Sequence, residues 1–217
     1  TTLDANIQQF AEDVCKTAYD AYDPEYTDSI VMNPKTGEIY AMAQYPSFDL
    51  NDPMKLTDLG KTNISSTWDK MTDKQKNDLA NKAWKNFAIT DTFEPGSIYK
   101  PIVVAMALEE GVIKSTDSFY CGGVKKIADY EIHCHNRNGH GTLSLTGVLA
   151  QSCNIGMMEI ITKLGAEKYL QYQHDFGFGE KTGIDLPNEA SASNLLYSLS
   201  NLHSAEMATS SFGQGFN

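Results

Sequence analysis

Ser97 and Lys100 have the residue types and the spacing that nucleophilic catalysis needs. Residues three positions apart share one face of a helix, so the Lys100 amine can reach the Ser97 hydroxyl and act on its proton. The serine follows a Pro95-Gly96 turn and precedes a long apolar pattern, which places it near a helix N-terminus that favours a developing negative charge. The same spacing also suits a serine that caps the helix beside a solvated lysine, so this pair alone leaves both interpretations open.

A second polar pair, Ser152 and Asn154, lies immediately before the strong helical pattern of residues 154–164. A hydroxyl and a carboxamide two residues apart can both face a cleft, where Ser152 relays a proton and Asn154 orients a substrate amide. Capping of the helix is the alternative role for these side chains.

Most of the cysteines and histidines fall between the two polar pairs. Zinc needs deprotonated sulfur, imidazole or carboxylate ligands that converge tetrahedrally. Cys134 and His140 can close a small loop around one ion, and Asp117 and Cys153 can join from either flank. The fourth cysteine, Cys15, lies in the first predicted helix, where we expect it to be buried and inert.

Hydrophobic periodicity predicts the elements that must position these residues. We expect helices at residues 5–22, 97–110, 142–150, 154–164 and 166–176, and a hairpin whose strands, 29–32 and 38–42, flank a turn at 33–37. In the first helix the apolar residues at helical spacing are Ile7, Phe10, Val14, Ala18 and Tyr22, and Asp4 or Thr2 can cap it. Residues 47–86 form a polar surface excursion with a short helix around 73–87, and 115–140 are irregular. An early helix and hairpin followed by a block of helices predict an α+β fold.

Size and charge exclude some functions. The 217 residues suffice for one sizeable domain, and 17 basic against 28 acidic side chains give a net charge of −11, which argues against a nucleic-acid partner. No apolar run approaches the roughly 20 residues that span a membrane, and no signal peptide is present. Both ends look like cuts through a larger protein, so localisation cannot be read from these absences.

Together these residues resemble the penicillin-binding transpeptidases, the serine acyltransferase superfamily that includes the β-lactamases. Ser97 and Lys100 match its Ser-x-x-Lys motif, and Ser152 and Asn154 match its Ser-x-Asn motif. The flanking segments similar to the class B, monofunctional members are 31–43, 93–101, 183–187 and 208–215. The resemblance implies that residues 1–217 are the N-terminal and helical part of a transpeptidase domain, with a helical block and part of a central antiparallel sheet.

The resemblance also implies a reaction. Ser97 would attack the penultimate D-Ala carbonyl of a peptidoglycan stem peptide, with Lys100 as its base and the Ser97 backbone N–H as half of the oxyanion hole. Ser152 would pass the proton and Asn154 would hold the substrate amide. No cofactor is needed for this chemistry. β-Lactams, which mimic D-Ala-D-Ala, would acylate the same serine.

The resemblance also implies a cellular localisation and protein partners. We expect the extracytoplasmic face of a bacterial cell membrane, and glycosyltransferases and other cell-wall synthesis proteins as partners. The excursion at 47–86 and the cysteine-rich loop resemble the elongation or sporulation branch of the class. The family's third motif, Lys-Thr-Gly or Lys-Ser-Gly, should follow the 208–215 segment, whereas Lys181-Thr182-Gly183 falls at a loop of the family. We therefore predict that this polypeptide alone does not acylate normally.

Some elongation-type members resemble this sequence in the cysteine-rich loop and hold zinc there. Their ligand pattern maps onto Asp117, Cys134, His140 and Cys153, with Cys121 and His135 as alternates. A structural Zn²⁺ would tie the loop that carries Cys153 to the region after the Ser97 helix. The alternatives are a Cys121–Cys134 disulfide, because the family works outside the cytoplasm, and free thiols with solvated histidines.

Two other functional classes share part of this pattern. A class D-like β-lactamase has the first two motifs, although the hairpin and the segment 183–187 are less expected there. A non-enzymatic β-lactam sensor, or a degenerate module used for protein interaction, is the third possibility. A Lys-Thr-Gly strand in the parent protein would favour the transpeptidase, and rapid β-lactam hydrolysis would favour the β-lactamase.

Overall fold

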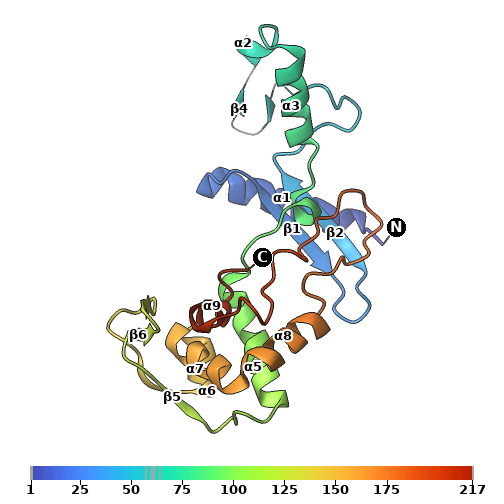
Figure 1. Ribbon diagram of the computed structural model, residues 1–217. Coiled ribbons are helices and arrows are strands. Elements are labelled where there is room, and N and C mark those ends of the chain that lie inside the picture. Colours follow the sequence, from blue (N-terminus) through green and yellow to red (C-terminus); the bar gives the residue numbers. More distant parts are fainter. Residues whose placement is uncertain (1, 57, 60–61, 64, 217) are drawn as a thin grey trace. The chain divides into compact units, whose positions relative to one another are not determined.

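A computed structural model describes residues 2–56, 58–59, 62–63 and 65–216. The chain divides after Asp91 into two compact units. Both combine helices with small antiparallel sheets, which confirms the predicted mixture of α and β structure (Figure 1). Within the described residues no helix has the length and apolar character to cross a membrane.

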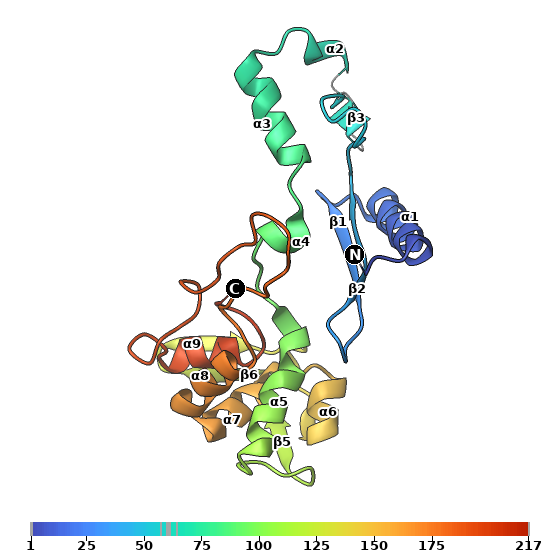
Figure 2. The same cartoon turned by 90° about the vertical axis from the view of Figure 1, so that its right-hand side faces the viewer.

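The first unit is built on a helix that packs against a hairpin. Helix α1 (Ala5–Tyr22) is capped by Asp4, one of the two caps that the sequence predicts, whose carboxylate accepts hydrogen bonds from backbone N–H groups of the first turn. Strands β1 (Thr27–Met32) and β2 (Ile39–Tyr45) pair antiparallel around the predicted turn, and α1 lies along them (Figure 2). The helix and the hairpin are therefore both confirmed.

The face of α1 that packs on the hairpin is offset from the large apolar side chains. Ala11, Cys15 and Tyr19 are buried, whereas Phe10 and Val14 are 73% and 60% exposed. Next to Tyr19, the small residues Ala11 and Cys15 of the helix pack against the two buried alanines of β2. Small side chains bring the helix close to the sheet, and the larger stripe is left one position away from the contact.

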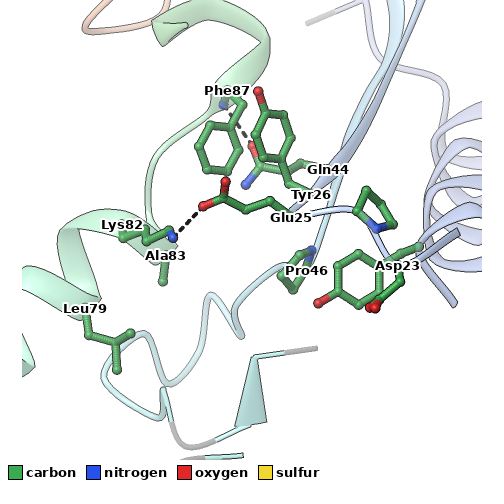
Figure 3. Close-up of a pocket in the computed structure, with 11 residues that line it drawn as sticks. Asp23, Glu25, Tyr26, Gln44, Pro46, Leu79, Lys82, Ala83 and Phe87 are labelled. Atoms are coloured by element: carbon green, nitrogen blue, oxygen red, sulfur yellow. Dashed lines mark hydrogen bonds and ion pairs between the residues drawn. The ribbon is translucent and has the colours of Figure 1, made fainter. Parts of the chain in front are cut away.

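The polar excursion carries short elements of its own. These are β3 (Asp58–Leu59), β4 (Thr62–Asn63), α2 (Ser65–Trp68), α3 (Asp73–Ala83) and α4 (Phe87–Thr90). Helix α3 starts with a capping box between Thr72 and Gln75, where the helix predicted around 73–87 begins, but it ends at Ala83. A cavity of about 400 Å³ lies in this unit (Figure 3). In its lining Tyr26 stacks on Phe87, and Lys82 Nζ donates a hydrogen bond to the Glu25 carboxylate.

The second unit is a helical block. It contains the 3₁₀ turn η1 (Gly96–Tyr99), α5 (Lys100–Glu109), α6 (Leu145–Ala150), α7 (Asn154–Leu164), α8 (Ala166–Asp175) and α9 (Ser204–Ser210). Helix α7 is buried on almost every side and packs against α5, α8 and α9 (Figure 2). The sequence predicts the bounds of α7 because an apolar pattern runs from Asn154 to Gly165, where a positive φ ends the helix.

The region predicted to be irregular contains two short antiparallel pairs. Strand β5 (Ser118–Cys121) pairs with β8 (Gly141–Ser144), and β6 (Val124–Ile127) pairs with β7 (Tyr130–His133). The helix predicted from residue 142 accordingly starts later, at Leu145, because Ser144 ends β8 and caps α6. Strands of four residues have too few alternations for periodicity to reveal them.

Candidate active site

Ser97 lies in the 3₁₀ turn that leads into α5. Gly96, just before it, has φ +61°, a left-handed conformation that glycine adopts without steric cost. The turn directs the chain into α5, so Ser97 stands at the N-terminus of a continuous helical segment. Backbone N–H groups there have no partner within the helix and can stabilise an oxyanion.

Lys100 is buried within this site, with only 2% of its surface exposed. Its Nζ lies 3.1 Å from Ser97 Oγ and 2.8 Å from Ser152 Oγ. The same nitrogen lies 2.7 Å from the Ser152 carbonyl oxygen and 2.8 Å from Asn154 Oδ1. Four oxygens therefore surround one amine.

The types of these oxygens fit a neutral amine. A neutral lysine has two N–H donors and one lone pair, and the carbonyl oxygens of Ser152 and Asn154 can only accept. They match the two donors, which leaves the lone pair to accept from the Ser97 hydroxyl at 3.1 Å while the Ser152 hydroxyl donates to Ser97 Oγ. Burial lowers the pKa of Lys100 below its ordinary 10.5, although the nearby thiols of Cys134 and Cys153 oppose that shift. Burial and geometry thus both favour a base.

Ser152 and Asn154 come from the junction between α6 and α7. Ser152 has φ +48°, which is unusual for a residue with a side chain, and its hydroxyl donates to Ser97 Oγ at 3.1 Å. Cys153 caps α7, and Asn154 is its first residue. Asn154 Nδ2 donates to the His133 carbonyl at 3.5 Å, so the end of β7 borders the site. The structure thus brings the four predicted catalytic residues together.

The Lys181-Thr182-Gly183 segment forms a loop. Both the backbone N–H and the hydroxyl of Thr182 donate to Glu189 Oε1 at 2.6 Å. These contacts hold the loop on itself, which agrees with the structural role predicted for it.

Four potential metal ligands converge beside the catalytic residues, because Cys153 lies between Ser152 and Asn154. Cys121, Cys134, His140 and Cys153 place one ligand atom each within 4.8 Å of all the others. The three cysteines are buried, and all are free thiols. The Cys134 Sγ lies 3.7 Å from His140 Nδ1, close to the sulfur–nitrogen edge of about 3.6 Å expected for a tetrahedron with zinc–sulfur bonds of about 2.3 Å and zinc–nitrogen bonds of about 2.0–2.1 Å.

Backbone contacts build this group from two loops. The His140 N–H donates to the Cys121 carbonyl at 3.0 Å, and the Cys134 N–H donates to the Gly123 carbonyl at 2.9 Å. A Cβ on Gly139 would lie 2.4 Å from the Cys121 carbonyl oxygen, so the loops approach more closely than a side chain allows. The ligands are therefore preorganised by the fold.

The thiols differ in acidity. Burial raises the pKa of Cys153 to about 12. Burial acts in the same direction on Cys134, but the Asn154 and Asn136 N–H groups and the neighbouring thiols outweigh it and lower the pKa of Cys134. Of these two thiols, Cys134 is therefore the one with the lower pKa.

Asp117 and His135, both candidates from the sequence, are not among these four ligands, although His135 Nδ1 also lies 3.8 Å from Cys134 Sγ. The Asp117 carboxylate accepts from the Lys114 N–H and lies 3.8 Å from Lys163 Nζ. Asp117 precedes β5 and Cys121 ends it, and four strand residues span about 13 Å, so the two cannot serve the same position. The alternate Cys121 takes the place expected for Asp117.

Two contributors are backbone carbonyls, of Ser152 and His133, which the sequence did not predict. A carbonyl belongs to every residue and therefore leaves no residue-type signal. Only the expectation of a turn before α7 could have pointed to the first.

A buried lysine amine within hydrogen-bond distance of two serine hydroxyls has the groups that a serine acyltransferase with a lysine base requires. Residues 29–217 match the penicillin-binding protein transpeptidase domain, and the chain belongs to that family. Stage V sporulation protein D of Bacillus subtilis (strain 168) is 34% identical over 215 residues. That alignment covers 99% of this chain and 30% of the relative. The peptidoglycan D,D-transpeptidase FtsI homolog of Mesostigma viride is 33% identical over 86% of this chain and 29% of its own length.

Solved structures show the same fold. Penicillin-binding protein 3 of Mycobacterium tuberculosis, complexed with aztreonam, aligns with a TM-score of 0.78 and 25% identity over 99% of this chain and 43% of that one. The transpeptidase domain of Burkholderia pseudomallei penicillin-binding protein 3 gives 0.76 at 24% identity, over 99% and 53%, which is evidence for the fold alone. The chain spans about 30% of the length of the curated relatives quoted above.

Proposed function

We propose that this chain carries the acylation site of a peptidoglycan D,D-transpeptidase. The observation that carries the proposal is the Lys100 amine, buried and shared between the Ser97 and Ser152 hydroxyls. The names of relatives as peptidoglycan D,D-transpeptidases support the substrate class.

The proposed reaction proceeds in two transfers. Ser97 Oγ bonds to the penultimate D-Ala carbonyl carbon while its proton moves to Lys100 Nζ, directly or through Ser152 Oγ. The carbon–nitrogen bond to the terminal D-Ala breaks, and the leaving amine takes the proton. An amine from a neighbouring strand then attacks the ester, forms the cross-link and returns the proton to Ser97. Asn154 would hold the substrate amide.

The finer parts of the proposal follow from this activity. The substrate is a stem peptide ending in D-Ala-D-Ala, and β-lactams would acylate Ser97; the aztreonam complex of a relative supports the latter. The site would act on the extracytoplasmic face of a bacterial membrane beside glycosyltransferases and other cell-wall synthesis proteins. We also propose that residues 1–217 are part of a transpeptidase domain whose third motif lies outside this sequence.

Labelling with a fluorescent penicillin tests the function in the complete protein. We expect stable labelling that Ser97→Ala abolishes and that the control Ser193→Ala, at an exposed loop serine, retains. Labelling that persists in Ser97→Ala would overturn the assignment. Rapid turnover of the β-lactam would favour the β-lactamase, binding without acylation would favour the degenerate module, and an adjoining metalloprotease-like membrane segment in the parent protein would favour the sensor. The fragment 1–217 alone should label poorly.

We further propose that Cys121, Cys134, His140 and Cys153 hold a structural Zn²⁺. Their soft, sulfur-rich donor set and their convergence within 4.8 Å support this proposal. Bound zinc would supply no step of the reaction, but it would cross-link the β5–β8 region to the start of α7. The ligands would then fix the backbone on which Ser152 and Asn154 stand.

Elemental analysis of protein purified without added metal tests the zinc site. We expect about one zinc per chain, lost in Cys121→Ser and retained in Asp117→Asn. Thermal unfolding should shift downward when a chelator removes the metal, which gives a readout independent of acylation. Protein without metal, in which a tryptic map links Cys121 to Cys134, would replace zinc by the disulfide.

A further inference from the structure

Residues 213–216 lie against the turn that carries Ser97. The Gly96 N–H donates to the Gly213 carbonyl at 2.8 Å, and the Gly215 N–H donates to Glu94 Oε1 at 2.8 Å. Glu94 and Gly215 are 121 residues apart in sequence. One backbone bond and one carboxylate bond therefore join the segment before the nucleophile to the segment after α9.

The approach of the two segments requires glycine at position 213. A Cβ on Gly213 would lie 2.1 Å from the Gly96 carbonyl oxygen and 2.6 Å from the Gly96 nitrogen. Gly213 also has φ +79°, a conformation that side chains disfavour. The contact is thus a close backbone packing around the residue that precedes Ser97.

Aromatic packing anchors the segment after α9. Phe212 and Phe216 are 5% and 2% exposed. The Phe216 ring meets the Tyr99 ring edge-on at 4.9 Å, and Tyr99 is itself buried two residues after Ser97. The segment is therefore held in the core from which the Ser97 turn projects.

We propose that two contacts position the nucleophile: the Glu94 carboxylate accepts from the Gly215 N–H, and the Gly96 N–H donates to the Gly213 carbonyl. We call these two contacts the clamp. Glu94 and Gly213 are then positioning residues for acylation, and the inference rests on the proposed function. Lys100 holds Ser97 Oγ from one side, and the clamp holds the backbone before Ser97 from the other. Without the clamp, a Pro-Gly turn is free to move the hydroxyl away from the line of attack.

The Glu94 contact can be tested without removing a buried group, because this glutamate is exposed. In the complete protein we expect Glu94→Ala to lower the rate constant of penicillin acylation by on the order of ten- to a hundredfold, as a small misplacement of a reacting atom does. Noncovalent affinity for the β-lactam and the pH midpoint of acylation should stay unchanged. Glu94→Gln keeps an oxygen acceptor for the Gly215 N–H and should restore the rate to within about threefold.

Glu189→Ala is the matched control, because Glu189 also accepts a backbone N–H in an exposed loop of the same unit. It should leave the acylation rate unchanged. Equal rates for Glu94→Ala and Glu189→Ala would overturn the inference. So would a Glu94→Gln variant as slow as Glu94→Ala. If the unmodified complete protein is not acylated, the proposed function fails instead.

The clamp itself can be measured apart from acylation. Hydrogen exchange of peptides covering 94–99 and 211–216 should accelerate in Glu94→Ala and stay unchanged in Glu189→Ala. Gly213→Ala should abolish acylation, whereas Gly177→Ala, which has the similar φ of +82° but open space around its Cβ, should retain it. Unchanged exchange in Glu94→Ala, or normal acylation in Gly213→Ala, would refute the clamp whatever the substrate.

Discussion

Replacing Lys100 by methionine separates catalysis from stability. Methionine has a similar length and no donors, so the buried site keeps its volume while the amine disappears. Loss of the proposed base should slow penicillin acylation by about 10²- to 10⁴-fold, the usual contribution of a positioned general base. This change is measured as the pseudo-first-order rate of acylation in the complete protein.

The effect on stability follows from the four partners of Lys100 Nζ. The Ser97 and Ser152 hydroxyls can rotate to other partners, but the Ser152 carbonyl and Asn154 Oδ1 each lose a donor. Each orphaned acceptor costs about 1 kcal/mol at a partly open site. Removal of an amine whose pKa burial has lowered offsets part of this loss. We therefore expect the free energy of unfolding to fall by only about 1–2 kcal/mol in urea titrations.

Lys168→Met is the matched control, since Lys168 is half-exposed and pairs with Glu110 on the same unit. Its acylation rate should equal that of the unmodified protein. A Lys100→Met protein that folds and acylates within about threefold of the original would show that the amine is not the base. A Lys100→Met protein that is already unfolded in the absence of urea would show that Lys100 serves mainly stability.

Three further outcomes are expected. The acylation rate should rise with pH as Lys100 loses its proton, with a midpoint below 10.5 because burial lowers its pKa; a stopped-flow profile with its midpoint at or above 10.5 would contradict the buried amine. Gly156→Ala places a Cβ 2.7 Å from a valine methyl of α6 and should destabilise by about 1–3 kcal/mol in thermal unfolding, whereas Gly147→Ala meets only ordinary contacts of 3.4 Å and should be neutral or stabilising. Equal destabilisation by both would rule out overpacking between α6 and α7. Cys121→Ser should lower the thermal midpoint of metal-loaded protein more than that of chelated protein, and the two shifts should be equal if no metal binds.

Elements with long apolar patterns could be predicted from the sequence. The bounds of α1 and α7 follow from periodicity and caps that act within a few residues. The relation of Ser97 to Lys100 is equally local, since both lie on one helical turn. The face of α1 that is buried was not predictable, because it depends on how closely the small alanines of β2 let the helix approach.

Long-range contacts could not be derived from spacing. Ser97 and Ser152 are 55 residues apart, and only the resemblance to a family placed them in one site. The family pattern also pointed to Asp117 as a ligand. Sequence order does not reveal that strand β5 separates Asp117 from Cys121, so the error could be found only in the structure. The Glu94–Gly215 contact has no sequence signal, since glutamate and glycine are common and their separation is long.

The position of Ser152 is determined from two directions. Its left-handed backbone costs about 1–2 kcal/mol for a residue with a side chain, so the surrounding structure must hold it there. Lys100 donates to the Ser152 carbonyl on one side, and Cys153 on the other both caps α7 and belongs to the proposed zinc site. The conformation that points the Ser152 hydroxyl at Ser97 therefore depends on the proposed catalytic base and on the cysteine cluster together. Lys100 still holds the Ser152 carbonyl when the cysteine cluster is lost. We therefore expect loss of the cluster to impair proton transfer before it unfolds the helical block.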